Sequence, residues 1–245
     1  MALAAAGMAA GTINTVVGSG TLITFPVLLA FGYAPVTANV TNTLGLVPGS
    51  ASGAYGYREE LRGQWRRTAR LACASLSGGI CGAVLLLVLP ASAFKAIVPV
   101  FIAIALVLVV LQPRISEWLV TRGRRPTPHA GWAVLLAVFG TGIYGGYFGA
   151  AQGILLLAIL GLGLPESLQR INAVKNVLAG LVNLVAAVVF VIVAHIAYDA
   201  AALIAVGAAL GGVIGARVGR RLPPAALRAV IVAVGVSAIA QLVLR

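Results

Sequence analysis

The chain has 245 residues, of which 61% are hydrophobic and only 9% are charged, and its formal net charge is +12 at pH 7. Soluble domains carry about 25% charged residues, so this composition excludes an ordinary water-soluble protein and predicts an all-α, polytopic membrane protein. The basic excess does not indicate nucleic-acid binding, because the arginines cluster in short segments between apolar runs, where positive charge orients membrane helices.

The first apolar stretch is interrupted by a glycine-rich break. Residues 2–17 lead to Gly18-Ser19-Gly20, and the next apolar run, 20–31, is too short to cross roughly 30 Å of hydrocarbon as a helix. Lipid cannot satisfy a broken backbone, so a break at membrane depth must lie inside protein or line a wet cavity. We therefore expect residues 2–31 to form a re-entrant hairpin.

Three longer apolar runs follow, each with enough residues to span a membrane: 39–57, 71–89 and 96–112. Five arginines lie between residues 58 and 70, and four more lie within 113–130. Such clusters mark cytoplasmic loops. Residues 1–112 are thus predicted to be a first transmembrane repeat, and residues 113–130 a basic cytoplasmic loop.

The second half, residues 131–245, follows the same order. Runs 131–148 and 153–164 flank a break at 149–153, and longer runs follow at 171–194, 200–216 and 225–244. The basic segment 217–228 is also predicted to be cytoplasmic. An even number of crossings must join two cytoplasmic loops, so 131–164 must enter and leave on one side. The hairpins would then enter from opposite faces. This predicts two inverted repeats, each a re-entrant hairpin plus about three transmembrane helices, as in transporters with a midplane site.

The candidate binding residues lie at the two breaks and in the helices that follow them. The same polar spacing of i, i+3 and i+4 occurs after each hairpin, which places these side chains on one helical face. Amides and hydroxyls donate hydrogen bonds to an oxyanion, Lys175 adds a cation, and helix N-termini at the glycine breaks favour anions. The predicted substrate-binding residues are Gly18, Ser19, Gly20, Thr21, Asn39, Asn42, Thr43, Gln152, Gly153, Asn172, Lys175 and Asn176.

Each of these features has a structural alternative. The Asn and Thr side chains could simply join helices, and the glycines could mark close helix crossings. Lys175 lies a few residues from the start of its apolar run and could extend to the cytoplasmic interface. Pro26 and Pro48 could be plain kinks or unwound stretches.

Acidic residues are nearly missing, and none of the five lies well inside an apolar run. Cation sites and proton relays in membranes usually use Asp or Glu, and metal carriers use clusters of soft ligands or histidines. No catalytic or nucleotide-binding motif is evident. We therefore expect a protein that is not an enzyme and has no cofactor or metal site, and that transports a small anion by alternating access. A channel, a metal-ion exporter and a non-transporting membrane subunit are the alternatives.

The two breaks and their polar sequels resemble the sulfite exporter TauE/SafE family, also called the toluene-sulfonate uptake permease group. The resemblance rests on residues 11–26 with 37–43, and on residues 142–153 with 172–176. It implies a multi-pass permease of the plasma membrane for sulfite, an organosulfonate or another sulfur-containing anion. Family members often carry a proline after the glycines in each half, and the second half here lacks it. The expected partners are the small anion and membrane lipid, with a homodimer as an option.

Overall fold

The structure is a computed structural model that describes residues 1–121, 131–218, 232–233 and 236. The described residues form helices and short connections and contain no strand, which confirms the all-α prediction. Most of the expected span 225–244 and most of the segment 217–228 lie outside the described residues. The helices are α1 (Ala2–Val16), α2 (Thr21–Ala30), α3 (Pro35–Gly56), α4 (Trp65–Val88), α5 (Ala91–Thr121), α6 (Trp132–Tyr147), α7 (Gln152–Gly163), α8 (Leu168–Val193) and α9 (Tyr198–Val218).

Four of the described helices are long and apolar enough to cross a membrane: α4, α8, most of α5, and α9 up to Arg217. Helix α3 has 22 residues but is not among them, because its Asn, Thr and Ser side chains lower its hydropathy. Helices α1, α2, α6 and α7 are apolar and shorter, as expected for broken segments. The prediction of a polytopic membrane protein is confirmed.

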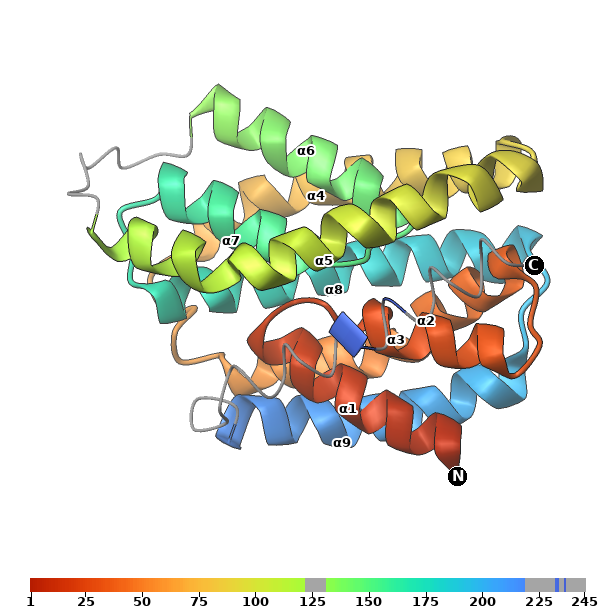
Figure 1. The fold of residues 1–245 in the computed structure, drawn as a ribbon. Helices are drawn as coiled ribbons and strands as arrows, with labels where there is room; N and C mark the ends of the chain where they lie inside the picture. Colours follow the sequence, from red (N-terminus) through yellow and green to blue (C-terminus); the bar gives the residue numbers. More distant parts are fainter. Residues whose placement is uncertain (122–130, 219–231, 234–235, 237–245) are drawn as a thin grey trace.

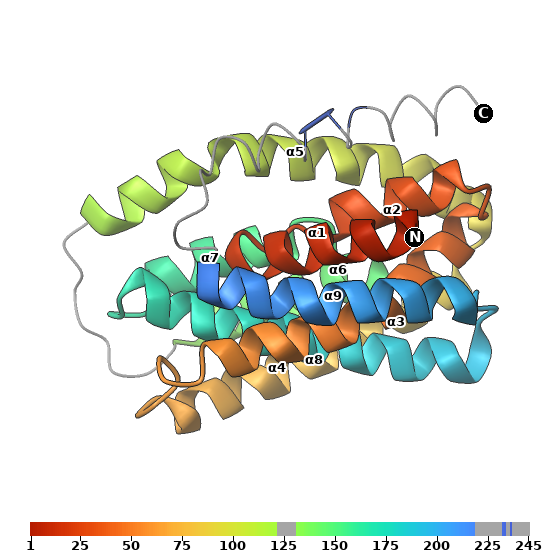
Figure 2. The same cartoon turned by 90° about the horizontal axis from the view of Figure 1, so that it is seen from below.

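Two helical hairpins enter the protein from opposite ends (Figures 1 and 2). Helices α1 and α2 form the first hairpin, whose base lies at the end that carries the α2–α3, α4–α5 and α8–α9 connections. Helices α6 and α7 form the second, whose base lies with the α3–α4 and α7–α8 connections. Both tips lie inside the protein. Two broken hairpins are thus present where the sequence predicts them, whereas their entry from opposite membrane faces and a symmetry relating the complete halves stay predictions.

The same turn ends the first helix of each hairpin. The Gly18 N–H donates to the carbonyl of Ile13 at 3.1 Å, and the Gly149 N–H donates to the carbonyl of Tyr144 at 3.1 Å. The φ angles of the two glycines are +87° and +74°. This left-handed conformation strains residues that carry a Cβ. Glycine at these two positions therefore lets each helix stop inside the protein.

Each hairpin packs along a helix of the other half. Helix α1 lies against α9 and α6 lies against α4, while α3 and α8 contact each other between them. A Cβ on Gly207 would lie 2.0 Å from the Ala4 carbonyl oxygen, and a Cβ on Gly82 would lie 2.0 Å from that of Ile143. Small residues let helix backbones approach this closely in membranes, where dispersion contacts replace the hydrophobic driving force.

Two sequence expectations about helix limits need correction, and one alternative that the sequence left open is decided. Helix α4 begins at Trp65, so part of the basic segment 58–70 is helix rather than loop. Helix α5 continues to Thr121, so the expected loop 113–130 begins as helix, and its remainder lies outside the described residues. Arginine is a good helix former, and a helix satisfies its own backbone groups beyond the hydrocarbon as well as within it. Helices α2 and α3 continue through Pro26 and Pro48, so neither proline marks an unwound stretch.

Candidate functional site

The tips of the two hairpins touch through their backbones. The Gly153 N–H, at the start of α7, donates to the Gly18 carbonyl at 3.0 Å. A Cβ built on Gly18 would lie only 2.4 Å from the Gly153 Cα, and one on Gly153 would lie 2.4 Å from the Gly18 Cα. Only glycine fits on both sides of this contact. We call it the tip junction and include in it the three α8 side chains that bind the first tip: Asn172, Lys175 and Asn176.

Lys175 is buried at the tip junction, with 0% of its surface exposed. Its Nζ lies 3.1 Å from the carbonyl oxygens of both Asn14 and Thr15, in the last turn of α1. Its stem passes the second tip, because a Cβ on Gly153 would lie 3.1 Å from the Lys175 Cδ. Lys175 therefore does not extend to the interface but connects α8 to both hairpin tips.

Asn172 and Asn176 bind the same end of α1. The Nδ2 atom of each donates to the Thr15 carbonyl at 3.3 Å. The last carbonyls of a helix have no partner within it and lie at the negative end of its dipole. Neither α1 nor α8 contains an acidic residue. The charge of Lys175 is therefore stabilised by helix carbonyls.

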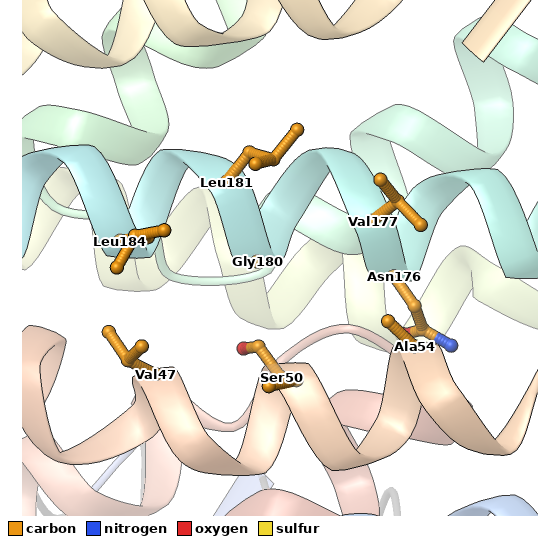
Figure 3. A pocket seen from close by; sticks show the side chains of 9 residues that line it. Val47, Ser50, Ala54, Asn176, Val177, Gly180, Leu181 and Leu184 are labelled. Atoms are coloured by element: carbon orange, nitrogen blue, oxygen red, sulfur yellow. The ribbon is translucent and has the colours of Figure 1, made fainter. Parts of the chain in front are cut away.

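A groove between α3 and α8 adjoins the tip junction. Figure 3 shows Ser50 facing it from α3 and Asn176 from α8. Its volume is about 190 Å³. Ala51 and Leu184 are exposed, so the groove opens to the surface. Its lining is mainly apolar and consists of Val47, Ser50, Ala51, Ala54, Asn176, Val177, Gly180, Leu181 and Leu184.

Amide donors surround the polar wall of this groove. The Ser50 Oγ accepts hydrogen bonds from Asn14 Nδ2 at 3.4 Å and from Asn183 Nδ2 at 3.3 Å. With these two bonds accepted, the Ser50 hydroxyl proton remains available as a donor. Asn176 belongs both to this wall and to the tip junction. The groove and the buried ammonium are thus linked through one residue.

The polar residues of α3 lie in separate contacts. Asn42 Nδ2 donates to Thr21 Oγ1 at 3.3 Å, and the Thr24 hydroxyl donates to Asn42 Oδ1. Asn39 Nδ2 donates to the carbonyl of Tyr147, at the end of α6, at 2.9 Å. Asn39 therefore donates to a carbonyl at the end of the first helix of the second hairpin, as Asn172 does at the end of the first helix of the first hairpin. Thr43 donates to the carbonyl of Asn39 in its own helix, at 2.9 Å.

The other predicted residues are buried near the tips. The Oγ of Ser19 has no hydrogen-bond partner in the described structure. The Gly20 N–H donates to Asn14 Oδ1 at 3.5 Å, and Gln152 Nε2 donates to the Thr141 carbonyl at 3.4 Å within the second hairpin. All twelve predicted residues are thus inside the protein, but they do not share one cavity. Of the twelve, Asn176 alone lines the groove described above.

Aromatic rings from both halves enclose the second tip. Phe148 lies 5.1 Å from Phe25 of α2 and 6.0 Å from Phe94 of α5, measured between ring centroids. Tyr144 packs on Phe101 at 5.2 Å, and its hydroxyl donates to the carbonyl of Ala150 in the tip. These edge-to-face contacts are favourable geometries for aromatic pairs. They hold the second tip against α2 and α5.

The sequence interpretation missed three contributors. Asn14 lies four residues before the glycine break, in the last turn of α1, and the break itself could have pointed to it. Ser50 lies seven residues after Thr43 and so falls on a similar face of α3. The Thr15 carbonyl is a backbone group, and no side-chain pattern could have indicated it. The described residues contain no group of three or more His, Cys, Asp or Glu side chains arranged to hold a metal ion.

Comparison with known proteins gives one family match and several relatives. The family described as "Sulfite exporter TauE/SafE" matches residues 3–242. "Probable membrane transporter protein ORF9" of Sinorhizobium sp is 32% identical over 145 residues, which are 59% of this chain and 54% of that protein. "Probable membrane transporter protein YfcA" of Escherichia coli (strain K12) is 28% identical over 178 residues, which are 69% of this chain and 64% of that protein. The chain thus spans between about half and two thirds of these relatives. No solved structure matches it significantly.

Proposed function

The chain belongs to the sulfite exporter TauE/SafE family, and from this premise we propose that it is a permease that moves a small anion across the plasma membrane by alternating access. The anion class that the proposal names is sulfite or a sulfur-containing organic anion such as an organosulfonate. The names of ORF9 and YfcA support membrane transport and give no substrate.

The observation that carries the proposal is the complete burial of the Lys175 side chain. None of the helices α1, α2, α3, α6, α7 and α8 contains Asp or Glu. Burying a charge away from water is costly unless opposite charge or dipoles compensate it. The carbonyls of Asn14 and Thr15 provide dipoles but no full negative charge. A small anion would supply that charge, whereas a free cation would be repelled.

We place the anion on the polar wall of the groove. Asn176 and the hydroxyl of Ser50 are hydrogen-bond donors there, and the Ser50 oxygen accepts from the amides of Asn14 and Asn183. Oxyanions accept several hydrogen bonds at once, and bonds to a charged acceptor are stronger than neutral ones. Asn176 and Lys175 both contact the Thr15 carbonyl, so the ammonium lies close to this wall. The apolar remainder of the lining would exclude water from the bound anion.

The hairpins suit a mechanism in which the site opens alternately to the two sides. They enter from opposite ends, and their tips are joined by one backbone hydrogen bond and by the α8 side chains. A displacement of one hairpin relative to α3 and α8 would change which end of the junction is covered. Rocking of one repeat against the other is the usual way in which such folds alternate access.

Binding can be tested by anion-dependent thermal stabilisation of the purified protein in detergent. The panel is sulfite, sulfate, thiosulfate, sulfoacetate, taurine and acetate, all as sodium salts at equal ionic strength. A ligand that binds only the folded state raises the melting temperature with its concentration. We expect one sulfur oxyanion to do so. In Asn176→Ala, loss of a hydrogen bond worth about 1–1.5 kcal/mol should raise the half-saturating concentration roughly tenfold.

The matched control is Lys95→Ala, which removes an exposed lysine at the start of α5. Its response to the anion should equal that of the wild type. Stabilisation by divalent metal ions without any response to the panel would contradict the proposal and support a metal exporter. Exchange of the labelled anion across liposome membranes then tests transport itself. Binding without exchange would identify a non-transporting membrane subunit.

A further inference from the structure

The C-terminal end of α1 has the character of a cation site. This helix stops inside the protein at the first tip, and its last carbonyls have no partner within the helix. The negative end of the helix dipole lies at the same place. In transporters with broken helices, the C-terminal ends of half-helices coordinate the coupling cation. The end of α1 therefore presents the groups that a coupling cation would use.

In this protein an ammonium group already occupies that position. Lys175 Nζ lies 3.1 Å from the carbonyl oxygens of Asn14 and Thr15, and the side chain is completely buried. Asn172 donates its amide to the same Thr15 carbonyl, and its own buried Oδ1 has no partner in the described structure. Two carbonyl oxygens at one helix end thus hold a cation that is covalently part of α8.

We propose that Lys175 is a tethered replacement for a coupling cation, so that anion transport needs no sodium. The statement about sodium rests on the proposed transport function. The statement that the Lys175 ammonium occupies a cation position at the end of α1 does not depend on it. Lys175 belongs to the second half of the chain, and Asn14 and Thr15 belong to the first. The contact between them therefore joins the two halves and must change when the first hairpin moves relative to α8.

The tether also explains how the anion would act on the hairpin. An anion on the groove wall near Asn176 attracts the same ammonium that holds the end of α1. The two interactions compete for one charge. Binding of the anion weakens the hold of Lys175 on the first tip and frees the hairpin to move. A free cation that links anion binding to hairpin movement would have to cross the membrane together with the anion. Lys175 stays attached to α8 and is available again for the next transport cycle.

The test uses Lys175→Ala, which removes the ammonium and leaves space in front of the two carbonyls. Melting temperatures are measured without any candidate substrate, in sodium chloride, methylammonium chloride or choline chloride at equal ionic strength. We expect the variant to melt below the wild type and to be raised by a few degrees by methylammonium or sodium relative to choline, which is too large for the space. Wild type and Lys95→Ala should show no difference between the three cations.

Lys175→Met is the second variant, since it keeps most of the stem and removes the charge. It fills the space, so it should be destabilised without rescue by either small cation. A wild-type protein that sodium stabilises specifically would overturn the proposal. So would a folded Lys175→Ala protein that melts at the same temperature in all three salts.

A measurement on the wild type keeps the proposal testable even if Lys175→Ala does not fold. Anion exchange in liposomes should proceed at rates within about twofold in sodium and in choline media, and a tenfold dependence on sodium would overturn the tethered-cation role. The two proposals fail separately. Absence of any response to the anion panel would remove the proposed function, while the cation rescue of Lys175→Ala uses no substrate and would stand.

Discussion

Gly18 and Gly153 bring the two hairpin tips into contact because neither carries a side chain. Gly153→Ala would place a methyl group 2.4 Å from the Gly18 Cα and 3.0 Å from the Gly18 carbonyl oxygen, and both of these atoms belong to the backbone. Overpacking of this kind costs about 1–3 kcal/mol. We expect the variant to lose several degrees of thermal stability and to lose anion-dependent stabilisation, because the tips must separate. Thermal scanning with and without the anion measures both effects.

Gly18→Ala and Gly32→Ala separate steric contact from backbone strain. Both glycines have positive φ, +87° and +89°, but a Cβ on Gly32 would meet nothing within 4 Å. Each alanine costs about 1–2 kcal/mol for the left-handed conformation, and only Gly18→Ala adds the clash with Gly153. Gly18→Ala should therefore be the less stable of the two. Equal melting temperatures would show that the tips do not depend on close contact.

At the scale of elements, Glu166 joins the connection between α7 and α8 to the start of α4. Its carboxylate lies 2.6 Å from Arg67 of α4 and 2.6 Å from Arg170 of α8. Partial burial opposes ionisation of Glu166, but the hydrogen bonds and charges of the two arginines outweigh it and hold its pKa below the usual value. The cluster therefore fixes the base of the second hairpin to the first half of the chain.

Glu166→Gln should remove about 1–2 kcal/mol of stability at neutral pH. A carboxyl whose pKa is lowered by folding contributes stability above its unfolded pKa and loses it as the pH falls through the folded pKa. The difference in melting temperature between wild type and variant should thus be full at pH 7 and shrink once the pH falls below the ordinary glutamate range. Glu59→Gln is the control, since its pair with Arg62 is largely exposed and should contribute little. A difference independent of pH would contradict this role.

At the scale of the molecule, we expect the two hairpins to be reached from opposite sides of the membrane. Ala34, at the base of the first hairpin, and Gln169, near the base of the second, are both exposed. In a background without the native thiols Cys73 and Cys81, an impermeant thiol reagent outside the cell should label Ala34→Cys and not Gln169→Cys. Inside-out vesicles should give the reverse result, because the basic segments are predicted to lie with the base of the second hairpin at the cytoplasmic face.

Arg62→Cys provides the reference for that face. It lies in the exposed α3–α4 connection, at the same end of the protein as the base of the second hairpin (Figure 1). It should be labelled together with Gln169→Cys in every preparation. Labelling of Ala34→Cys and Gln169→Cys from one side would rule out hairpins of opposite orientation, and with them the predicted inverted repeats.

The amino-acid sequence by itself determined three features: the lipid environment of the protein, its all-α fold and the positions of the two glycine breaks. The length of an apolar run and its lack of charged residues can be read from that segment alone. They indicated a membrane protein without knowledge of any tertiary contact. The glycine breaks are equally local, because a backbone that turns at positive φ strongly favours glycine, although Ala151 in the second tip also adopts a positive φ, +57°. The family resemblance on residues 11–26 and 142–153 followed from the same segments and agrees with the family match.

Only the tertiary structure decided what the polar residues contact. Lys175 could have reached the interface or the interior, and what holds it inside is the end of a helix 160 residues earlier in the chain. Asn42 matches Lys175 in spacing but binds Thr21 and Thr24, so the expected single site is divided into separate contacts. The groove depends on Ser50 and Asn176 from two helices that meet only in the fold. A hydrogen-bond donor can be recognised in a sequence, but its partner depends on how distant segments pack.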